Sequence, residues 1–165
     1  MENEIIIIEK KEYKQIDVIK TFKASSSNDI ISLSILNDQL IVGFLHPDKG
    51  CLGINYYDEN HKKINEKKIH CHKSEILKFT INNNGTYAST ISNDGMFIKI
   101  LDLTNLKLHT KFARGKLRKS TIYSLSFNTT STLIATTSSS GYLKIFNTDI
   151  MKDNAPKNKI DWSDN

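Results

Sequence analysis

Cysteine, proline and arginine are scarce in this chain of 165 residues, which holds two of each. The cysteines, Cys51 and Cys71, show no CxxC spacing, so the sequence predicts reduced thiols and no disulfide framework. Glycine is limited to seven residues, while hydrophobic residues make up 38% and charged residues 25% of the chain. This composition excludes collagen-like and disordered classes and indicates a globular domain with a core of its own.

Long hydrophobic runs and catalytic motifs are missing as well. The run Ile5–Ile8 has four residues, far short of the ~20 that a membrane-spanning helix requires. No targeting segment is recognisable, so we expect a cytoplasmic protein whose membrane contact is peripheral. His70, Cys71 and His72 are consecutive, but neighbouring residues on a strand point to opposite faces, which disfavours a zinc site. No nucleophile–base pair, paired carboxylates or phosphate loop can be identified, so we expect neither an enzyme nor a cofactor.

The basic residues are distributed unevenly between lysine and arginine. The net charge is +5, which favours acidic partners, and it is carried by 21 lysines and only two arginines. Both arginines, Arg114 and Arg118, lie in the basic segment 111–119. A guanidinium grips phosphate oxygens through a bidentate fork, so this segment is a candidate anion-binding element. A solvated basic loop is the alternative interpretation of the same cluster.

An internal repeat is the strongest pattern in the sequence. Ile122 follows Ile76 by 46 residues, and Gly141 follows Gly95 by the same 46. A fainter copy lies about one period upstream, in residues 30–58. Each copy consists of short alternating or β-branched segments separated by Asn, Asp, Gly and Ser, which are strand and hairpin signals. No stretch shows a capped helical periodicity.

Short strands that recur at this period indicate a β-propeller with one four-stranded antiparallel blade per repeat. A β-sandwich is the alternative, but it does not predict a hairpin glycine at a fixed offset. We expect the last strands of one blade in residues 1–22, blades in 30–70 and 75–112, and part of a fourth in 121–147. Residues 148–165 are expected to form a polar tail or loop.

About three blades are too few to close a ring, since closed propellers typically need at least four. A partial ring leaves edge strands exposed, which favours association. Three explanations are open: a truncated sequence, a chain that pairs with another propeller fragment, or a true fragment with altered packing.

Several elements of the repeat carry a family resemblance. They are His72-Lys73-Ser74 at the opening of a blade, Ser92-Asn93-Asp94-Gly95 at its hairpin, Phe112-Ala113-Arg114-Gly115 after its last strand, and Ile122–Phe127 with Lys144–Phe146 in the next blade. With these elements the chain resembles the PROPPIN family, seven-bladed WD-repeat-like propellers that bind phosphoinositides in autophagy. The resemblance covers most of the chain, as a partial-length member.

The resemblance implies two headgroup pockets, one served by each arginine of the family's Phe-Arg-Arg-Gly element. Here Ala113 replaces the first arginine, so the motif is degenerate. We expect a degraded first pocket that retains His72, Thr90, Ser92 and Lys99, with Met96 in place of a threonine. We expect a better-kept second pocket formed by Arg114, Gly115, Thr137, Ser138 and Lys144, which Tyr142 is expected to crowd.

The function implied by the resemblance is non-catalytic binding of phosphatidylinositol 3-phosphate or 3,5-bisphosphate. The expected partners are phosphoinositide-containing membranes of the endosomal, vacuolar or autophagic system and autophagy-type proteins. The alternative is a degenerate propeller that acts as a protein–protein interaction scaffold without lipid binding. Nucleic-acid binding ranks third, because it rests on charge alone: the tyrosines are scattered and form no stacking platform.

Overall fold

The structure, a computed structural model, describes residues 3–21, 30–94, 96–114 and 120–148. This part of the chain consists of β-strands joined by turns, with no helix. The strands are β1 (Asn3–Ile8), β2 (Gln15–Thr21), β3 (Ile31–Leu36), β4 (Gln39–Leu45), β5 (Cys51–Tyr57), β6 (Lys63–His70), β7 (Ile76–Ile81), β8 (Tyr87–Ser92), β9 (Phe97–Asp102), β10 (Lys107–Ala113), β11 (Ile122–Phe127), β12 (Leu133–Ser138) and β13 (Leu143–Asn147).

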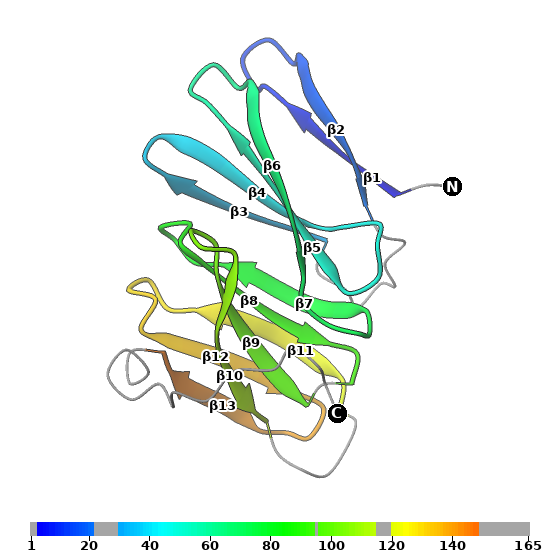
Figure 1. Ribbon diagram of the computed structural model, residues 1–165, viewed down its shortest axis with the longest axis vertical. Helices are drawn as coiled ribbons and strands as arrows, with labels where there is room; N and C mark the ends of the chain where they lie inside the picture. Colours follow the sequence, from blue (N-terminus) through cyan, green and yellow to red (C-terminus); the bar gives the residue numbers. More distant parts are fainter. Residues whose placement is uncertain (1–2, 22–29, 95, 115–119, 149–165) are drawn as a thin grey trace.

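The strands form four antiparallel sheets, each built from consecutive strands. The first sheet is β1–β2, the second β3–β6, the third β7–β10 and the fourth β11–β13. The sheets follow one another in chain order along the long axis of the molecule, from the first at the top to the fourth at the bottom (Figure 1). The prediction of an all-β fold with four-stranded antiparallel blades in an open ring is confirmed.

Turn residues explain why the strands pair with their neighbours in sequence. Leu36 lies opposite Gln39, so Asn37 and Asp38 alone connect β3 to β4. Both have positive φ angles, 50° and 61°, which the type I′ hairpin turn requires and which Asn and Asp tolerate better than most residues. Gly85, between β7 and β8, and Ser131, between β11 and β12, occupy positive-φ positions in the corresponding turns of the later sheets.

The hydrophobic core lies between the sheets, because each strand directs alternate side chains to the two neighbouring sheets. On β4, Val42 and Phe44 pack in the cluster shared with the first sheet, whereas Ile41 and Leu45 pack toward the third sheet. A third cluster joins the third and fourth sheets and includes Ile98 of β9. The same interblade packing is therefore repeated along the molecule.

The two end sheets each have a face that no other described sheet covers. On the fourth sheet this face presents Leu143 and Ile145, which are 62% and 58% exposed. On the first sheet, Ile6 and Ile8 are also more than half exposed. Figure 1 shows that the four sheets form an open stack and do not close on themselves.

Candidate functional site

Arg114 lies at the junction of the third and fourth sheets. Its main-chain N–H donates to the carbonyl of Met96 (2.9 Å), which extends the β9–β10 ladder one residue past β10. Two residues earlier, Phe112 stacks on Phe146 of the fourth sheet with ring centroids 5.0 Å apart. Because side chains two residues apart share a face, Arg114 is directed toward the fourth sheet. There its Nη2 donates to the hydroxyl of Ser120, just before β11 (3.1 Å).

Lys144 approaches the same place from the fourth sheet. Its Nζ donates to the main-chain carbonyl of Arg114, so its ammonium group lies beside the arginine backbone. Lys144 shares a face of β13 with Phe146, and Ser138 shares a face of β12 with the core residue Ile134. The structure thus brings together Arg114 and Lys144, two of the residues predicted for the second pocket, whereas the hydroxyl of Ser138 lies 2.7 Å from that of Ser140.

The other residues predicted for this pocket are placed differently. Thr137 alternates with Ser138 on β12 and faces away from the third sheet, where its hydroxyl hydrogen-bonds that of Ser124 (2.7 Å). Tyr142 is 69% exposed in the turn before β13. Gly115 lies outside the described residues.

The residues predicted for the first pocket are buried and bonded to protein atoms. Nε2 of His72 lies 3.0 Å from the hydroxyl of Thr90, and the hydroxyl of Ser92 donates to Asp94 (2.7 Å). Nζ of Lys99, which is only 3% exposed, donates to the carbonyl of Cys71 (2.9 Å). The His72 and Lys99 contacts link the chain after the second sheet to the third sheet, whereas the Ser92 contact lies within the third sheet. All of these side chains present little surface to a ligand.

Lys99 and Lys144 hold equivalent places in successive sheets. Lys99 lies opposite Thr90, and Lys144 lies opposite Thr136. Each lysine donates to a carbonyl just beyond the outermost strand of the preceding sheet, that of Cys71 or of Arg114. This interblade lysine contact was not predicted, because its acceptor is a main-chain atom that no sequence motif marks.

Two further polar residues of this region were not predicted from the sequence. Ser120 contacts the guanidinium directly, and the buried Thr136 donates to the carbonyl of Ser124 (3.0 Å). Thr136 follows Thr90 by 46 residues, so the repeat offset itself could have pointed to it. Ser120 likewise follows Ser74 by 46 residues.

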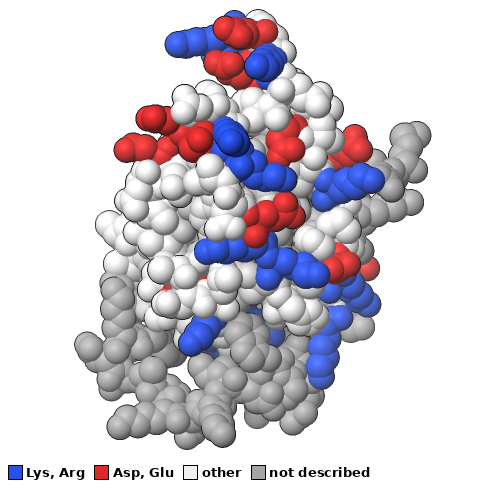
Figure 2. Space-filling view, turned by 45° about the horizontal axis from the view of Figure 1, so that its top comes forward, with Lys and Arg blue, Asp and Glu red and all other residues white. Residues whose placement is uncertain are grey.

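The electrostatic setting of Arg114 differs from that of the surface lysines. Burial lowers the pKa of its guanidinium from the ordinary value, yet arginine stays cationic at any physiological pH. Elsewhere, Figure 2 shows lysine and acidic side chains interspersed over the visible face, without one continuous basic patch. The cationic character of the candidate site is therefore local.

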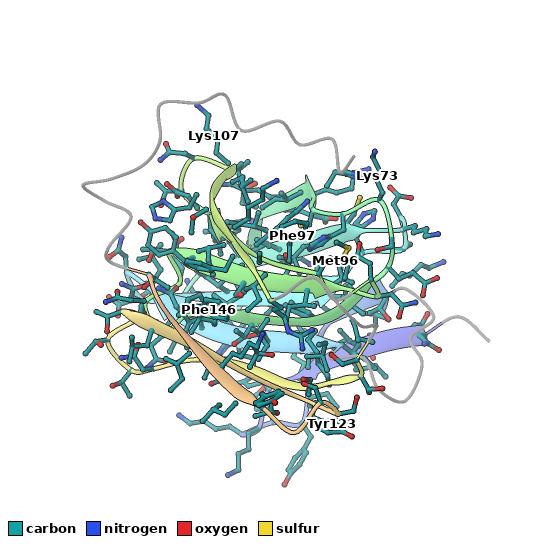
Figure 3. All side chains as sticks on the ribbon, turned by 90° about the horizontal axis from the view of Figure 1, so that it is seen from below. Lys73, Met96, Phe97, Lys107, Tyr123 and Phe146 are labelled. Carbon is teal, nitrogen blue, oxygen red and sulfur yellow. The ribbon has the colours of Figure 1, made fainter. Side chains whose placement is uncertain are left out.

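The candidate site occupies one end of the strands of the third sheet. Met96, whose carbonyl accepts from Arg114, lies on the same side of the molecule as Lys73 in Figure 3. Lys107, at the far end of β10, projects on the other side of that view. Lys107 is therefore a suitable control position for the site.

Other features do not add a reactive centre to this site. The described residues contain no group of three His, Cys, Asp or Glu side chains that could hold a metal ion. They also include no helix that is long and apolar enough to cross a membrane. Cavities of about 110 and 200 Å³ between the sheets are lined by residues other than those predicted for the two pockets.

Four-stranded antiparallel sheets stacked face to face in chain order define a segment of a β-propeller. The PROPPIN family model matches residues 1–165, and the chain belongs to the PROPPIN family. Autophagy-related protein 18 of Aspergillus oryzae is 37% identical over 78 residues, which cover 47% of this chain and 19% of that protein. The matching protein of Aspergillus terreus gives the same values.

Solved structures show the same fold. The structure of Kluyveromyces lactis Hsv2p aligns with a TM-score of 0.69 and 19% identity, over 93% of this chain and 47% of that one. KlAtg21, in its complex with the coiled coil of AgAtg16, aligns with a TM-score of 0.65 and 22% identity, over 90% and 48%. The chain thus spans less than half the length of these relatives.

Proposed function

We propose that this chain contributes the phosphoinositide-binding part of a non-catalytic autophagy effector that associates peripherally with membranes. The observation that carries the proposal is the meeting of Arg114 and Lys144 in one interblade space, where the guanidinium also contacts the Ser120 hydroxyl. Family membership supports it, because the chain keeps the second arginine of the family's Phe-Arg-Arg-Gly element as Arg114. The membranes we expect are endosomal, vacuolar or autophagic.

The chemistry proposed for the site is recognition without covalent change. A headgroup phosphate requires converging donors, and a guanidinium fork with an ammonium group and a hydroxyl provides them. Lys144 also fixes the main chain at Arg114 through the carbonyl that it binds. Arg114 therefore acts as the main phosphate ligand, and Lys144 positions it as well as adding charge.

A single working pocket implies weak binding. The first pocket lacks its arginine at Ala113, and its remaining polar groups are buried in hydrogen bonds. Two pockets on one rim would reinforce each other through effective concentration, and that gain is lost when one fails. We therefore expect membrane binding that is weaker and more sensitive to salt than that of a relative with both arginines.

Flotation of the chain with vesicles tests this function. Vesicles that contain phosphatidylinositol 3-phosphate or the 3,5-bisphosphate should carry the chain upward, whereas matched vesicles of neutral lipid should not. Arg114→Lys keeps the charge but removes the bidentate fork, so it should reduce flotation. Equal flotation with both kinds of vesicle would contradict the proposal.

A protein-interaction scaffold without lipid binding is the second candidate. The buried hydrogen bonds of His72, Ser92 and Lys99 favour it, because they serve the packing of the sheets and not a ligand. KlAtg21 has been solved with a coiled coil, so a coiled-coil autophagy protein is the first partner to test by pull-down. Capture of such a partner without any flotation on phosphoinositide vesicles would select this candidate.

A further inference from the structure

A second polar cavity lies between the first and second sheets, separate from the Arg114 site. Its volume is about 200 Å³, and its polar lining comes from Lys20 of β2, His46 after β4, Asn55 of β5, and Lys63 and Glu66 of β6. Dedicated ligand pockets usually measure roughly 300–1,000 Å³, so this cavity suits a small polar molecule or a single headgroup.

Asn55 supplies the observation that points to a ligand. Its side chain is 1% exposed, and its Oδ1 has no hydrogen-bond partner among the described residues. The orientation of the amide is fixed by its neighbours. The Tyr57 hydroxyl donates to Asp17 Oδ2 (2.7 Å), so it must accept from Asn55 Nδ2 (3.3 Å). The Oδ1 atom of Asn55 is therefore the one left without a hydrogen-bond donor, and a buried acceptor without a donor costs roughly 1–3 kcal/mol.

The rest of the polar lining is mainly donor groups. Nδ1 of His46 accepts from the main-chain N–H of Asp48 (3.0 Å), so in the neutral imidazole the ring proton sits on Nε2. Nζ of Lys63 lies 3.2 Å from Glu66 and 3.7 Å from Asp17, so its charge is shared with two carboxylates. Lys20 brings a second ammonium group to the cavity.

We propose that this interblade cavity binds a small phosphorylated polyol. The phosphate group would accept hydrogen bonds from Lys20, from Nε2–H of His46 and from Lys63, because a phosphate offers several acceptor oxygens to such donors. A carbon-bound hydroxyl of the polyol would donate to Asn55 Oδ1 while the phosphate oxygens accept from the cationic donors, whereas inorganic phosphate has only its own P–OH proton for that contact. This assignment is independent of the Arg114 site, which lies between other sheets.

Calorimetric titration of the 165-residue chain with myo-inositol 1-phosphate tests the site, with myo-inositol and inorganic phosphate as reference ligands. The phosphorylated polyol should bind at least about tenfold more tightly than either reference, since each lacks one class of contact. Absence of binding, or equal affinity for inorganic phosphate, overturns the proposal and leaves a water-filled polar cavity.

Single-residue variants test whether the ligand binds in this cavity. Lys20→Gln should weaken it by about tenfold, and Asn55→Leu should remove the preference for the polyol over inorganic phosphate. Lys107→Gln, outside both sites, should leave it within about twofold. Lys20 is exposed, so we expect Lys20→Gln to fold even if Asn55→Leu does not. Lys20→Gln alone then shows whether the ligand binds in this cavity. Binding that survives Lys20→Gln but disappears in Arg114→Ala overturns the proposal.

A vesicle experiment distinguishes the two sources of such a ligand. If the polyol phosphate is a lipid headgroup, Lys20→Gln should lower flotation on phosphatidylinositol-phosphate vesicles as well as calorimetric binding. If it is a soluble metabolite, Lys20→Gln should lower only the calorimetric binding. Failure of the Arg114 proposal would show as unchanged flotation of Arg114→Ala, and it would leave the effect of Lys20→Gln on calorimetric binding as predicted.

Discussion

Replacement of Lys99 by methionine separates the structural role of this lysine from a lipid-binding role. Lys99 is buried, and its ammonium group donates to the carbonyl of Cys71, which links the third sheet to the chain leaving the second. Lys99→Met keeps most of the volume of the side chain and removes the charged donor. It therefore tests the hydrogen bond with little change in packing.

The expected cost follows from the contact that is lost. A hydrogen bond from a charged donor contributes about 1.5–3 kcal/mol, and the Cys71 carbonyl loses that donor. With a urea m-value of about 2 kcal/mol/M, a loss of about 2 kcal/mol lowers the midpoint of unfolding by about 1 M. Binding of the folded variant to phosphoinositide vesicles should stay unchanged, because the buried ammonium group does not face a ligand.

Urea denaturation followed by circular dichroism measures the first effect, and vesicle flotation of the folded variant measures the second. Lys107→Met, on the exposed start of β10, is the matched control and should shift the midpoint by no more than about 0.3 M. An unchanged midpoint for Lys99→Met together with a loss of flotation would show that Lys99 binds lipid and does not stabilise the contact between the sheets.

Three further predictions concern single residues. A Cβ atom added at Gly50, whose φ is +72°, would lie 1.7 Å from a main-chain oxygen, so Gly50→Ala should lower the free energy of unfolding by more than about 3 kcal/mol in thermal unfolding. Gly141 has a φ of +79° and open space around it, so Gly141→Ala should lower that free energy by about 1–2 kcal/mol. Equal losses for the two variants would contradict this prediction. Ala113→Arg should increase flotation on phosphoinositide vesicles by restoring an exposed cation, and an unchanged fraction would show that the first pocket is closed. Burial raises the pKa of the Cys71 thiol to about 12, so its thiolate is scarce below that pH, and iodoacetamide should label Cys71 at pH 8 only after unfolding; rapid labelling of the native chain would count against its burial.

Much of the fold could be predicted because local signals and tertiary packing agree. The repeat at 46 residues, the alternating strands and turns such as Asn37-Asp38 all specify consecutive antiparallel strands. The interblade clusters follow from the same alternation, since central strands such as β5 and β8 are buried on both faces. The sequence alone predicted the architecture for this reason.

The candidate site was harder to predict because a shift of one residue reverses the face of a side chain. Thr137 was expected in the second pocket, but Thr136 and Ser138 share the face toward the third sheet. A β-bulge between Ile122 and Ser124 adds a local change of register that the sequence does not reveal. Arg114 stands out as a candidate in the sequence because arginine is so rare in this chain.

The affinity of Arg114→Ala for vesicles containing phosphatidylinositol 3-phosphate tests directly whether Arg114 binds the headgroup phosphate. Dissociation constants should be measured for the unmodified chain, Arg114→Ala and Lys107→Ala at one fixed salt concentration. We expect a loss of at least about tenfold for Arg114→Ala, since it removes charge-assisted hydrogen bonds to phosphate, and less than about twofold for Lys107→Ala. Equal affinities for all three proteins would contradict it.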